Sequence, residues 1–504
     1  MRYYVPKLIV MKTKSLLSCL MFAICANIHT TNAQVNVQDS LALVDLYNST
    51  DGSHWKQNKN WLTSNPVSKW LGIGVRNSTV TYVNLNYNNL NGRLPSSIGS
   101  LTNLTTLLLV GNHLSGNIPS SIGNLVRLTS LYLAENRLGG NIPASIGNLV
   151  KLDALFLDNN RLSGAIPNSI GNLAKLQFLE LYNNQLTGNI PSSIGNLRNL
   201  WFLDLGGNQL TGLIPSSFRN LINLQALSLG GNHLKGTIPS FIGNFTHLEY
   251  YLSLESNDLT GSIPSSLGNL RALLYLDLHD NRLNGAIPSS LANLGGINDE
   301  NVGWMDLSQN SFTFDGMQLI AKTFPHHSAY NHQANIPIHQ HGNTLSVYAG
   351  GTLSNNTYKW FKCDGPGTAP ILVATIKGDS VFHPKENGKY RAVVSNSVAT
   401  QLKLFTKLYD YTVPNNTLVA SDKNALHQFG IANAFRVYPN PAKDILRVET
   451  NGSATFSLIN QSGKILITIN IAGKGSINIS GITPGLYYLR NNSTDNVQKV
   501  VIAR

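Results

Sequence analysis

The sequence predicts an α/β solenoid of about ten coils, followed by two small all-β sandwich domains. The first observation behind this is a segment of 24 residues that recurs almost unchanged, so that Leu128 and Asn136 of one copy return as Leu152 and Asn160 of the next. A fixed period of this length is typical of solenoids, in which each repeat is one coil. The second observation is a change to strand-like alternation of apolar and polar residues after the repeats end.

Residues 1–33 are predicted to be a secretory signal peptide. Two lysines precede an apolar stretch too short to span a bilayer, and small residues just before Gln34 permit cleavage there. Translation from Met1 or from Met11 would produce such a leader. Lipidation of Cys25 is disfavoured, because the residue before it is larger than a lipoprotein signal requires.

Residues 34–79 are predicted to form an N-terminal cap. An amphipathic stretch suited to a short helix comes first, and Trp55, Trp61 and Trp70 follow. The open end of a solenoid exposes core leucines, which a cap must cover. The tryptophans could also stack on a sugar ring, but packing inside the cap is the favoured interpretation.

The solenoid is expected over residues 80–324. In each repeat the Leu-x-Leu segment is predicted to be a short strand with its leucines pointing inward, and Gly-x-Ile-Pro and one short helical turn complete the coil. The asparagine that ends each strand is assigned a structural role, because its amide can both donate to and accept from buried backbone groups. These asparagines are Asn88, Asn112, Asn136, Asn160, Asn184, Asn208, Asn232, Asn257, Asn281 and Asn310.

Two departures from the period have structural consequences. One extra residue between Leu248 and Leu252 predicts a local bulge. Extra residues at 295–301 predict a projecting loop near the C-terminal end of the array.

The consensus LxxLxxLxLxxNxLxGxIPxxIGNL resembles the plant-type leucine-rich repeat. The run from Trp70 to Val75 is similar to the cap that precedes such repeats, but it lacks the flanking cysteine pairs that plant extracellular proteins of this type usually carry. The resemblance implies an α/β leucine-rich-repeat solenoid, a class that binds partners through its variable residues. The missing cysteines favour a bacterial exported protein.

Residues 325–341 contain five of the 13 histidines of the chain. A metal site needs ligands that are fixed in one geometry and supported by further partners. This stretch lacks helical spacing, so a solvated His-rich linker is predicted, with weak metal binding as the alternative. The histidines are His326, His327, His332, His339 and His341.

Residues 342–408 are predicted to be an all-β spacer domain. Their alternating strands resemble an immunoglobulin-like sandwich, with Trp360 and Tyr390 in the usual core places and without paired cysteines. The polar residues 409–431 are expected to be a linker.

Residues 432–504 resemble the C-terminal sorting domain of the type IX secretion system of the Bacteroidetes. The motifs that carry the resemblance follow one another in order across the whole block. The resemblance implies passage across the outer membrane, followed by attachment to surface lipopolysaccharide or by release. The sorting-motif residues are Tyr438, Pro439, Asn440, Pro441, Gly463, Lys464, Gly485, Tyr487 and Lys499.

Charge and composition exclude several classes of function. The chain has a net charge of +12, but residues 80–317 carry 11 Lys and Arg against 14 Asp and Glu. A nucleic-acid interface would need clustered basic residues with interleaved aromatics, so no nucleic-acid partner is expected. No phosphate loop or His-Glu-x-x-His motif is present, and Cys363 lacks a paired histidine. We therefore expect no catalytic residues, no metal, no cofactor and no enzyme.

The outward positions of the solenoid strands are the strongest candidate binding site. Aromatic and acidic side chains recur there on the face expected to be concave, and exposed aromatics are common interface anchors. The acids favour a basic or hydroxyl-rich partner. The candidate ligand-binding residues are Tyr132, Phe156, Asp158, Phe178, Glu180, Tyr182, Phe202, Asp204, Tyr251, Glu255, Tyr275, Asp277 and Trp304.

The sequence thus favours a monomeric recognition protein at the cell surface or outside the cell, without a transmembrane helix, that binds a protein or glycan on its concave face. One alternative is a structural or adhesive surface component without a specific ligand. A weaker alternative is ice binding, which needs a flat rank of Thr, Ser and Asn. The convex positions vary too much for that, since they include Ala165, Leu213 and Thr237 beside several asparagines.

Overall fold

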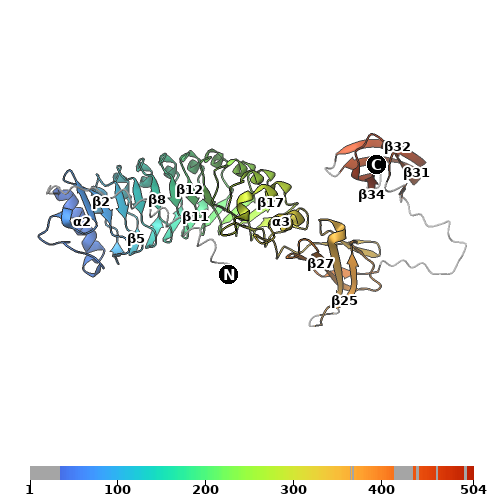
Figure 1. Ribbon diagram of the computed structural model, residues 1–504, viewed down its shortest axis with the longest axis horizontal. Coiled ribbons are helices and arrows are strands. Elements are labelled where there is room, and N and C mark those ends of the chain that lie inside the picture. Colours follow the sequence, from blue (N-terminus) through green and yellow to red (C-terminus); the bar gives the residue numbers. More distant parts are fainter. Residues whose placement is uncertain are drawn as a thin grey trace. The chain divides into compact units, whose positions relative to one another are not determined.

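The computed structural model divides the chain into two compact units, residues 1–414 and residues 415–504, which are described separately (Figure 1). The predicted signal peptide and the greater part of the predicted linker lie outside the described residues. The described residues are 35–363, 365, 368–413, 435–438, 442–460, 464–492 and 497–503.

The N-terminal cap covers the first coil with a helix and three tryptophans. Helix α2 (Val37–Ser49) begins where the Asn36 side chain accepts a hydrogen bond from the Asp39 backbone N–H at 2.8 Å. Trp55, Trp61 and Trp70 are buried, and the ring of Trp61 lies 4.9 and 4.8 Å from the other two, centroid to centroid. The tryptophans therefore pack inside the cap, as expected.

The Leu-x-Leu segments form one continuous sheet, the main sheet. Strand β1 (Ile73–Arg76) pairs antiparallel with β2, and every later neighbour pairs parallel. The leucines point inward with no exposed surface and build the core. After β1, the order is β2 (Thr79–Asn84), β4 (Thr106–Leu108), β6 (Ser130–Tyr132), β8 (Ala154–Phe156), β10 (Phe178–Glu180), β12 (Phe202–Asp204), β14 (Ala226–Ser228), β16 (Tyr251–Ser253), β18 (Tyr275–Asp277), β20 (Trp304–Asp306) and β21 (Ser328–Ala329).

A second parallel sheet, which the sequence did not suggest, lies where only a turn was expected. Its strands are short, polar and rich in glycine, a composition that β-propensity disfavours. They pair because each repeat places the same segment beside its copy in the next coil. The strands are β3 (Asn91–Arg93), β5 (His113–Asn117), β7 (Arg137–Asn141), β9 (Arg161–Ala165), β11 (Gln185–Asn189), β13 (Gln209–Gly212), β15 (His233–Thr237), β17 (Asp258–Gly261) and β19 (Arg282–Leu283).

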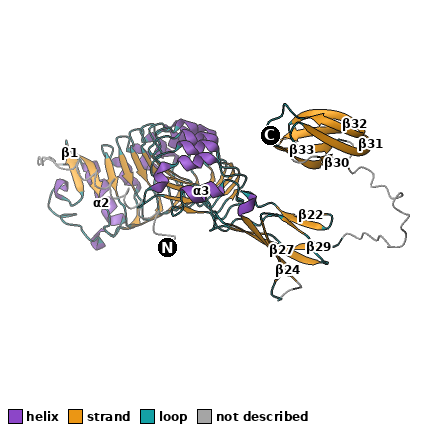
Figure 2. Ribbon diagram, turned by 45° about the vertical axis from the view of Figure 1, so that its right-hand side comes forward, coloured by secondary structure: helices purple, strands orange, loops and turns teal. Residues whose placement is uncertain are grey.

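The helical turn of each repeat is a 3-10 helix, and the turns stack along one side of the array (Figure 2). Each turn of the repeats begins after a proline, which needs no hydrogen-bond acceptor at a helix start. In the cap these helices are η1 (Gly52–His54) and η2 (Val67–Lys69), and in the array they are η3 (Ser96–Ser100), η4 (Ser120–Asn124), η5 (Ala144–Asn148), η6 (Asn168–Asn172), η7 (Ser192–Asn196), η8 (Ser216–Asn220), η9 (Ser240–Asn244), η10 (Ser265–Asn269), η11 (Ser289–Asn293) and η12 (Gly295–Asn298).

The repeated asparagines form a ladder that joins successive coils, which confirms their structural role. In the middle of the array, Asn208 Nδ2 donates to the carbonyls of Leu181, Leu205 and Gly206 at 3.0, 3.1 and 3.0 Å. Its Oδ1 accepts from the Leu186 N–H at 3.0 Å. One side chain thus satisfies four backbone groups of two coils at a buried turn.

The two departures from the period have different outcomes. The expected bulge between Leu248 and Leu252 is wrong, because β16 pairs in uninterrupted register with β14 and β18. The extra residue is accommodated just before the strand, because the Glu249 amide donates to the Gln225 carbonyl while the next partner, Ala226, pairs with Tyr251. The insertion at 295–301 does form an added segment, helix η12 and an exposed turn.

The His-rich stretch is not a solvated linker, so that interpretation is wrong. Helix α3 (Met317–Thr323) closes the solenoid, and β21 then extends the main sheet by pairing with β20. Strand β22 (Ile338–His341) belongs to the next domain. His327 Nδ1 lies 3.0 Å from the Gly303 carbonyl oxygen, and His339 and His341 lie on β22. Backbone pairing therefore ties both ends of this stretch to the neighbouring sheets.

The following β domain consists of two antiparallel sheets around Trp360 and Tyr390. Phe382 packs between these two buried side chains, with ring centroids 4.9 and 5.6 Å away. The domain extends beyond residue 408, because β29 pairs with β27. The strands are β22, β23 (Thr344–Val347), β24 (Asn356–Cys363), β25 (Ile371–Lys377), β26 (Val381–Phe382), β27 (Gly388–Asn396), β28 (Lys403–Phe405) and β29 (Tyr409–Tyr411), with a 3-10 turn η13 (Leu353–Asn355).

The C-terminal unit has an antiparallel sheet and a core of its own. Its described residues form five strands in one sheet. Phe435, Phe456 and Leu489 are among its buried core residues. The strands are β30 (Phe435–Tyr438), β31 (Ile445–Asn460), β32 (Ile465–Asn478), β33 (Gly485–Asn491) and β34 (Val497–Ile502).

Candidate functional site on the main sheet

The candidate site is the outward surface of the main sheet, which we call the main-sheet face. It consists of the non-core side chains of β4 through β20 and of the residues next to those strands. Because successive coils lie only about 4.8 Å apart, outward side chains of neighbouring coils touch. The predicted ligand-binding residues therefore form continuous rows across the coils.

An aromatic band runs along the first half of this face. The rings of Tyr132 and Phe156 stack with centroids 4.4 Å apart, and Phe178 packs edge-on against Phe156 at 6.4 Å. Trp201, which sequence analysis missed, packs edge-on against Phe178 at 6.0 Å and is 42% exposed. Tyr182 is 44% exposed. Aromatic rings that pack on one another and still face solvent are suited to anchor a partner.

The expectation that the aromatics of this face are exposed is wrong for three of them. Phe202, Tyr251 and Tyr275 are buried and form a small cluster of their own outside the main core, and the rings of Phe202 and Tyr251 meet at right angles 5.7 Å apart. Of the predicted residues, Tyr182 is exposed, Tyr132, Phe156, Phe178, Asp204, Glu255 and Trp304 are half-buried, and Asp158, Glu180, Phe202, Tyr251, Tyr275 and Asp277 are buried.

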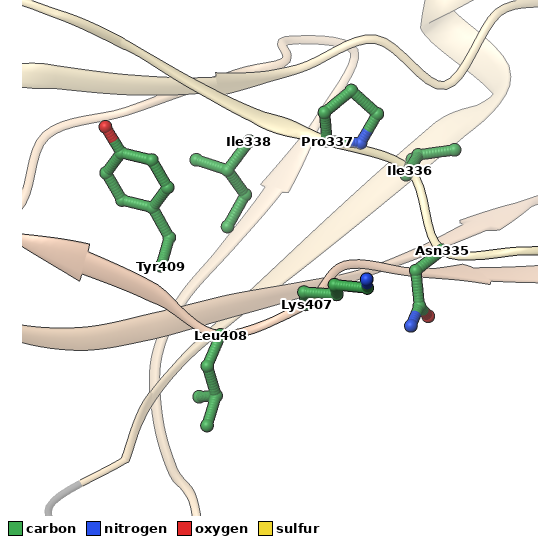
Figure 3. A pocket seen from close by; sticks show the side chains of 7 residues that line it. All are labelled: Asn335, Ile336, Pro337, Ile338, Lys407, Leu408 and Tyr409. Carbon is green, nitrogen blue, oxygen red and sulfur yellow. The ribbon is translucent and has the colours of Figure 1, made fainter.

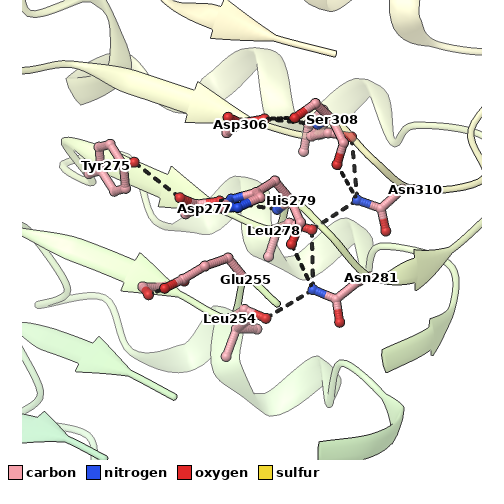
Figure 4. Close-up of polar contacts among 12 residues, drawn as sticks. Leu254, Glu255, Tyr275, Asp277, Leu278, His279, Asn281, Asp306, Ser308 and Asn310 are labelled. Atoms are coloured by element: carbon pink, nitrogen blue, oxygen red, sulfur yellow. Dashed lines mark hydrogen bonds and ion pairs between the residues drawn. The ribbon is translucent and has the colours of Figure 1, made fainter. Parts of the chain in front are cut away.

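An acidic network occupies the second half of the face (Figure 4). Tyr275 donates to Asp277 Oδ2 at 3.1 Å, and His279 Nδ1 lies 2.6 Å from Asp277 Oδ1. On the next coil, Asp306 Oδ1 accepts from the Ser308 hydroxyl at 2.6 Å and from its N–H at 2.9 Å. The strands hold these residues in consecutive coils, so carboxylates that are 24 or more residues apart in sequence lie side by side.

Burial and hydrogen bonds, together with neighbouring carboxylates, shift several pKa values of this network upward. Burial, with the charge of Asp277 as the second cause, raises the pKa of Glu255 to about 7. The hydrogen bond to Asp277 raises the pKa of His279 to about 9. Burial also raises the pKa of Asp306. Both Glu255 and His279 therefore bind protons more tightly in the folded chain than in the unfolded one.

The repeat array is expected to lose stability as the pH rises from about 4.5 to 9. Glu255 has a folded pKa of about 7 against 4.5, so its contribution is lost as the pH rises towards 7. His279 has a folded pKa of about 9 against 6.5, so its contribution is lost as the pH rises through 9. Denaturant unfolding at several pH values measures this, and Glu255→Gln should flatten the lower part of the profile. Stability that rises between pH 6 and 9 would contradict the assignment.

Asp277, His279 and Asp306 form a group whose ligand atoms lie within 4.8 Å of one another and could hold a metal ion. The chain itself already engages these atoms, however. Both oxygens of Asp277 and one oxygen of Asp306 accept hydrogen bonds from Tyr275, His279 and Ser308. These carboxylates are therefore satisfied by hydrogen bonds from within the chain.

A shallow pocket of about 270 Å³ lies where the chain enters the β domain (Figure 3). Backbone and apolar side chains form most of its wall, and the only charged side chain among its lining residues is that of Lys407. It offers no constellation suited to catalysis. The lining residues are Asn335, Ile336, Pro337, Ile338, Lys407, Leu408 and Tyr409.

The described sorting-motif residues lie on or beside the strands of the C-terminal unit. Tyr487 is buried on β33, where its hydroxyl donates to the Thr483 carbonyl at 2.7 Å. Gly485 begins β33, Lys499 is exposed on β34, and Tyr438 ends β30. Lys464 precedes β32. The remaining motif residues, Pro439, Asn440, Pro441 and Gly463, lie outside the described residues.

Family models match both parts of the chain. Leucine-rich-repeat models match residues 126–186 and six further segments between 79 and 294. The model of the secretion system C-terminal sorting domain matches residues 436–503. The chain is a leucine-rich-repeat protein with a type IX sorting domain. The sorting domain indicates export to the cell surface or beyond. Among the described residues, no helix is both long enough and apolar enough for a membrane crossing.

Solved structures resemble the repeat array. One is the ectodomain of the plant membrane receptor kinase GASSHO1/SCHENGEN3 from Arabidopsis thaliana, solved in complex with CASPARIAN STRIP INTEGRITY FACTOR 2. Its sequence is 34% identical to this one, and the TM-score is 0.52. The match covers 59% of this chain and 35% of that chain. This chain thus spans about a third of that ectodomain.

Two further solved structures also resemble the array, one from a plant and one from Leptospira interrogans. A plant ice-binding protein is 26% identical with a TM-score of 0.49, over 59% of this chain and 96% of that one. A leucine-rich-repeat protein of Leptospira interrogans is 29% identical with a TM-score of 0.38, over 51% and 68%. The search of curated proteins gives no match.

Proposed function

We propose that this chain is a non-enzymatic recognition protein, delivered to the cell surface or released, that binds a protein or glycan ligand on the main-sheet face. The aromatic band is the observation that carries the proposal. Tyr182 and Trp201 remain more than 40% exposed while neighbouring rings pack against one another. Large exposed aromatics are costly in solution, and they commonly mark interaction sites.

The similarity to the plant receptor ectodomain supports a binding role. That protein was solved in complex with a factor, and its array is 34% identical to this one. The sorting domain also supports this role, because export brings the array to ligands outside the cell. Export followed either by attachment to surface lipopolysaccharide or by release is part of the proposal that the resemblance of the sorting domain supports.

Replacing Tyr182 and Trp201 together by alanine is expected to weaken ligand retention at least about tenfold, because interface anchors of this type contribute 2 kcal/mol or more. The measurement is retention of the exported chain on a combined protein and glycan array. Stability should change little, since both side chains are over 40% exposed.

The matched control is Ile222→Ala, which removes a side chain of 54% exposure in the turn after η8. It should leave array retention unchanged. Equal retention by the wild-type chain and the double variant would refute the proposal and favour a structural surface component without a specific ligand.

A further inference from the structure

The middle of the main-sheet face has an acidic cluster, in which the side chains of Asp204, Ser228 and Glu255 gather over two glycines. Gly206 and Gly230 occupy the outward position that Tyr182 and Glu255 fill in flanking coils. A Cβ atom at Gly206 would lie 2.8 Å from Ser228 Oγ, and one at Gly230 would lie 2.1 Å from the Glu255 carboxylate. Side-chain oxygens of neighbouring coils therefore fill the space over both glycines.

Tyr251 has a buried hydroxyl group near the same acids. The residue is 6% exposed, and its hydroxyl has no hydrogen-bond partner in the chain. Burial raises the pKa of Tyr251, and the charges of Asp204, Glu180 and Glu255 raise it further, so the phenol faces these acids. A buried hydroxyl without a partner is costly, which indicates that a group from outside the chain engages it.

The charged side chains of this cluster are acidic. No Lys or Arg stands at an outward position of the described strands β4 through β20. His279 is already engaged by Asp277 at 2.6 Å. The Glu255 carboxylate accepts from Ser253 Oγ, and Asp204 Oδ1 accepts a backbone N–H at 2.9 Å. Neighbouring buried carboxylates repel one another, so a cation placed among them would be stabilised.

We propose that this acidic cluster, formed by Asp204, Ser228, Tyr251 and Glu255, binds a basic side chain of a peptide ligand, with arginine as the best fit. A guanidinium group offers five donors in one plane, which suits two carboxylates and a phenol oxygen. The proposal rests on the proposed function, because it assigns one contact within the same face.

The test compares matched peptides on the full exported chain. Each peptide carries arginine or, in its partner, citrulline, which has nearly the same shape and no charge. The arginine peptides are expected to bind at least about tenfold more tightly. Glu255→Gln should remove that preference, and Tyr251→Phe should reduce it. Asp204→Asn is a second charge-removing variant, should Glu255→Gln fail to fold.

The pH dependence separates a binding role of Glu255 from a structural one. The pKa of Glu255 is about 7, so arginine peptides should bind more tightly at pH 8 than at pH 6, while citrulline peptides should not. The titratable groups that act on Glu255 are Asp277 and His279 on the next coil, together with the phenols of Tyr251 and Tyr275. A preference for arginine that is independent of pH would overturn the role of Glu255.

The other outcomes are equally distinct. Equal binding of arginine and citrulline peptides, both lost in the Tyr182 and Trp201 double variant, would overturn the subsite and leave the proposed function standing. A glucosamine oligomer or Ca²⁺ that binds in a Glu255-dependent manner, without an arginine preference, would overturn the peptide assignment. If the wild-type chain retains no array ligand at all, the subsite and the proposed function both fail.

Discussion

A chain that lacks residues 435–504 is expected to be absent from the cell surface and the medium and to accumulate in the periplasm. These residues contain the match to the secretion system sorting domain. They form part of a separate compact unit whose core includes Phe435, Phe456 and Leu489. The repeat array has its own core, so the truncation should abolish delivery and leave the folding of the array intact.

Fractionation and protease treatment of intact cells measure this effect. The full chain with Tyr182→Ala is the matched control and should be delivered as the wild type is. In the reciprocal test, a leader and residues 415–504 are fused to an unrelated periplasmic reporter, which should then reach the surface. Surface delivery of the truncated chain would show that the export signal lies elsewhere.

Replacing Asn208 by alanine is expected to destabilise the array by about 3–5 kcal/mol, because four backbone groups at a buried turn lose their partner at once. The three carbonyls and one N–H that it satisfies belong to adjacent coils. No water can replace the side chain without opening the core between them. Denaturant unfolding of the purified chain, followed by tryptophan fluorescence, measures the change.

The control is an asparagine of the same array without this role. Asn172 is exposed at the end of η6, and Asn172→Ala should change stability by less than about 0.5 kcal/mol. An equally small effect of Asn208→Ala would mean that the ladder contributes little and that leucine packing alone holds the coils together.

The residues of the main-sheet face show how much of the candidate site could be predicted from the sequence. The period of 24 residues indicates which side chains point outward, so the rows that contain Phe178, Asp204 and Glu255 could be read directly. Trp201 was missed because it lies one residue before the expected row, in a position where the neighbouring coils carry Gln177 and Gln225. The available signal was a large aromatic residue at a repeat position that is polar in the neighbouring coils.

Local sequence patterns failed to predict the second sheet and the structure of the His-rich stretch. Segments rich in glycine and polar residues have low strand propensity, yet they pair because identical segments stack in successive coils. Likewise, nothing in the composition of residues 325–341 reveals that Ser328 and Ala329 complete the main sheet. In both cases the partner strand, rather than the segment itself, decides the structure.

The sequence by itself determined the solenoid, its inward leucines, the role of its asparagines and the sorting domain. The first three follow from residues that recur at a fixed spacing, and the sorting domain follows from motifs in a fixed order. Only the tertiary structure decided which outward side chains remain accessible. Coils that lie about 4.8 Å apart force large side chains to cover one another, so Phe202, Tyr251 and Tyr275 are buried while Tyr182 and Trp201 stay exposed. The same crowding leaves Tyr251 without a partner beside a group of acids, which is the feature that points to a basic ligand.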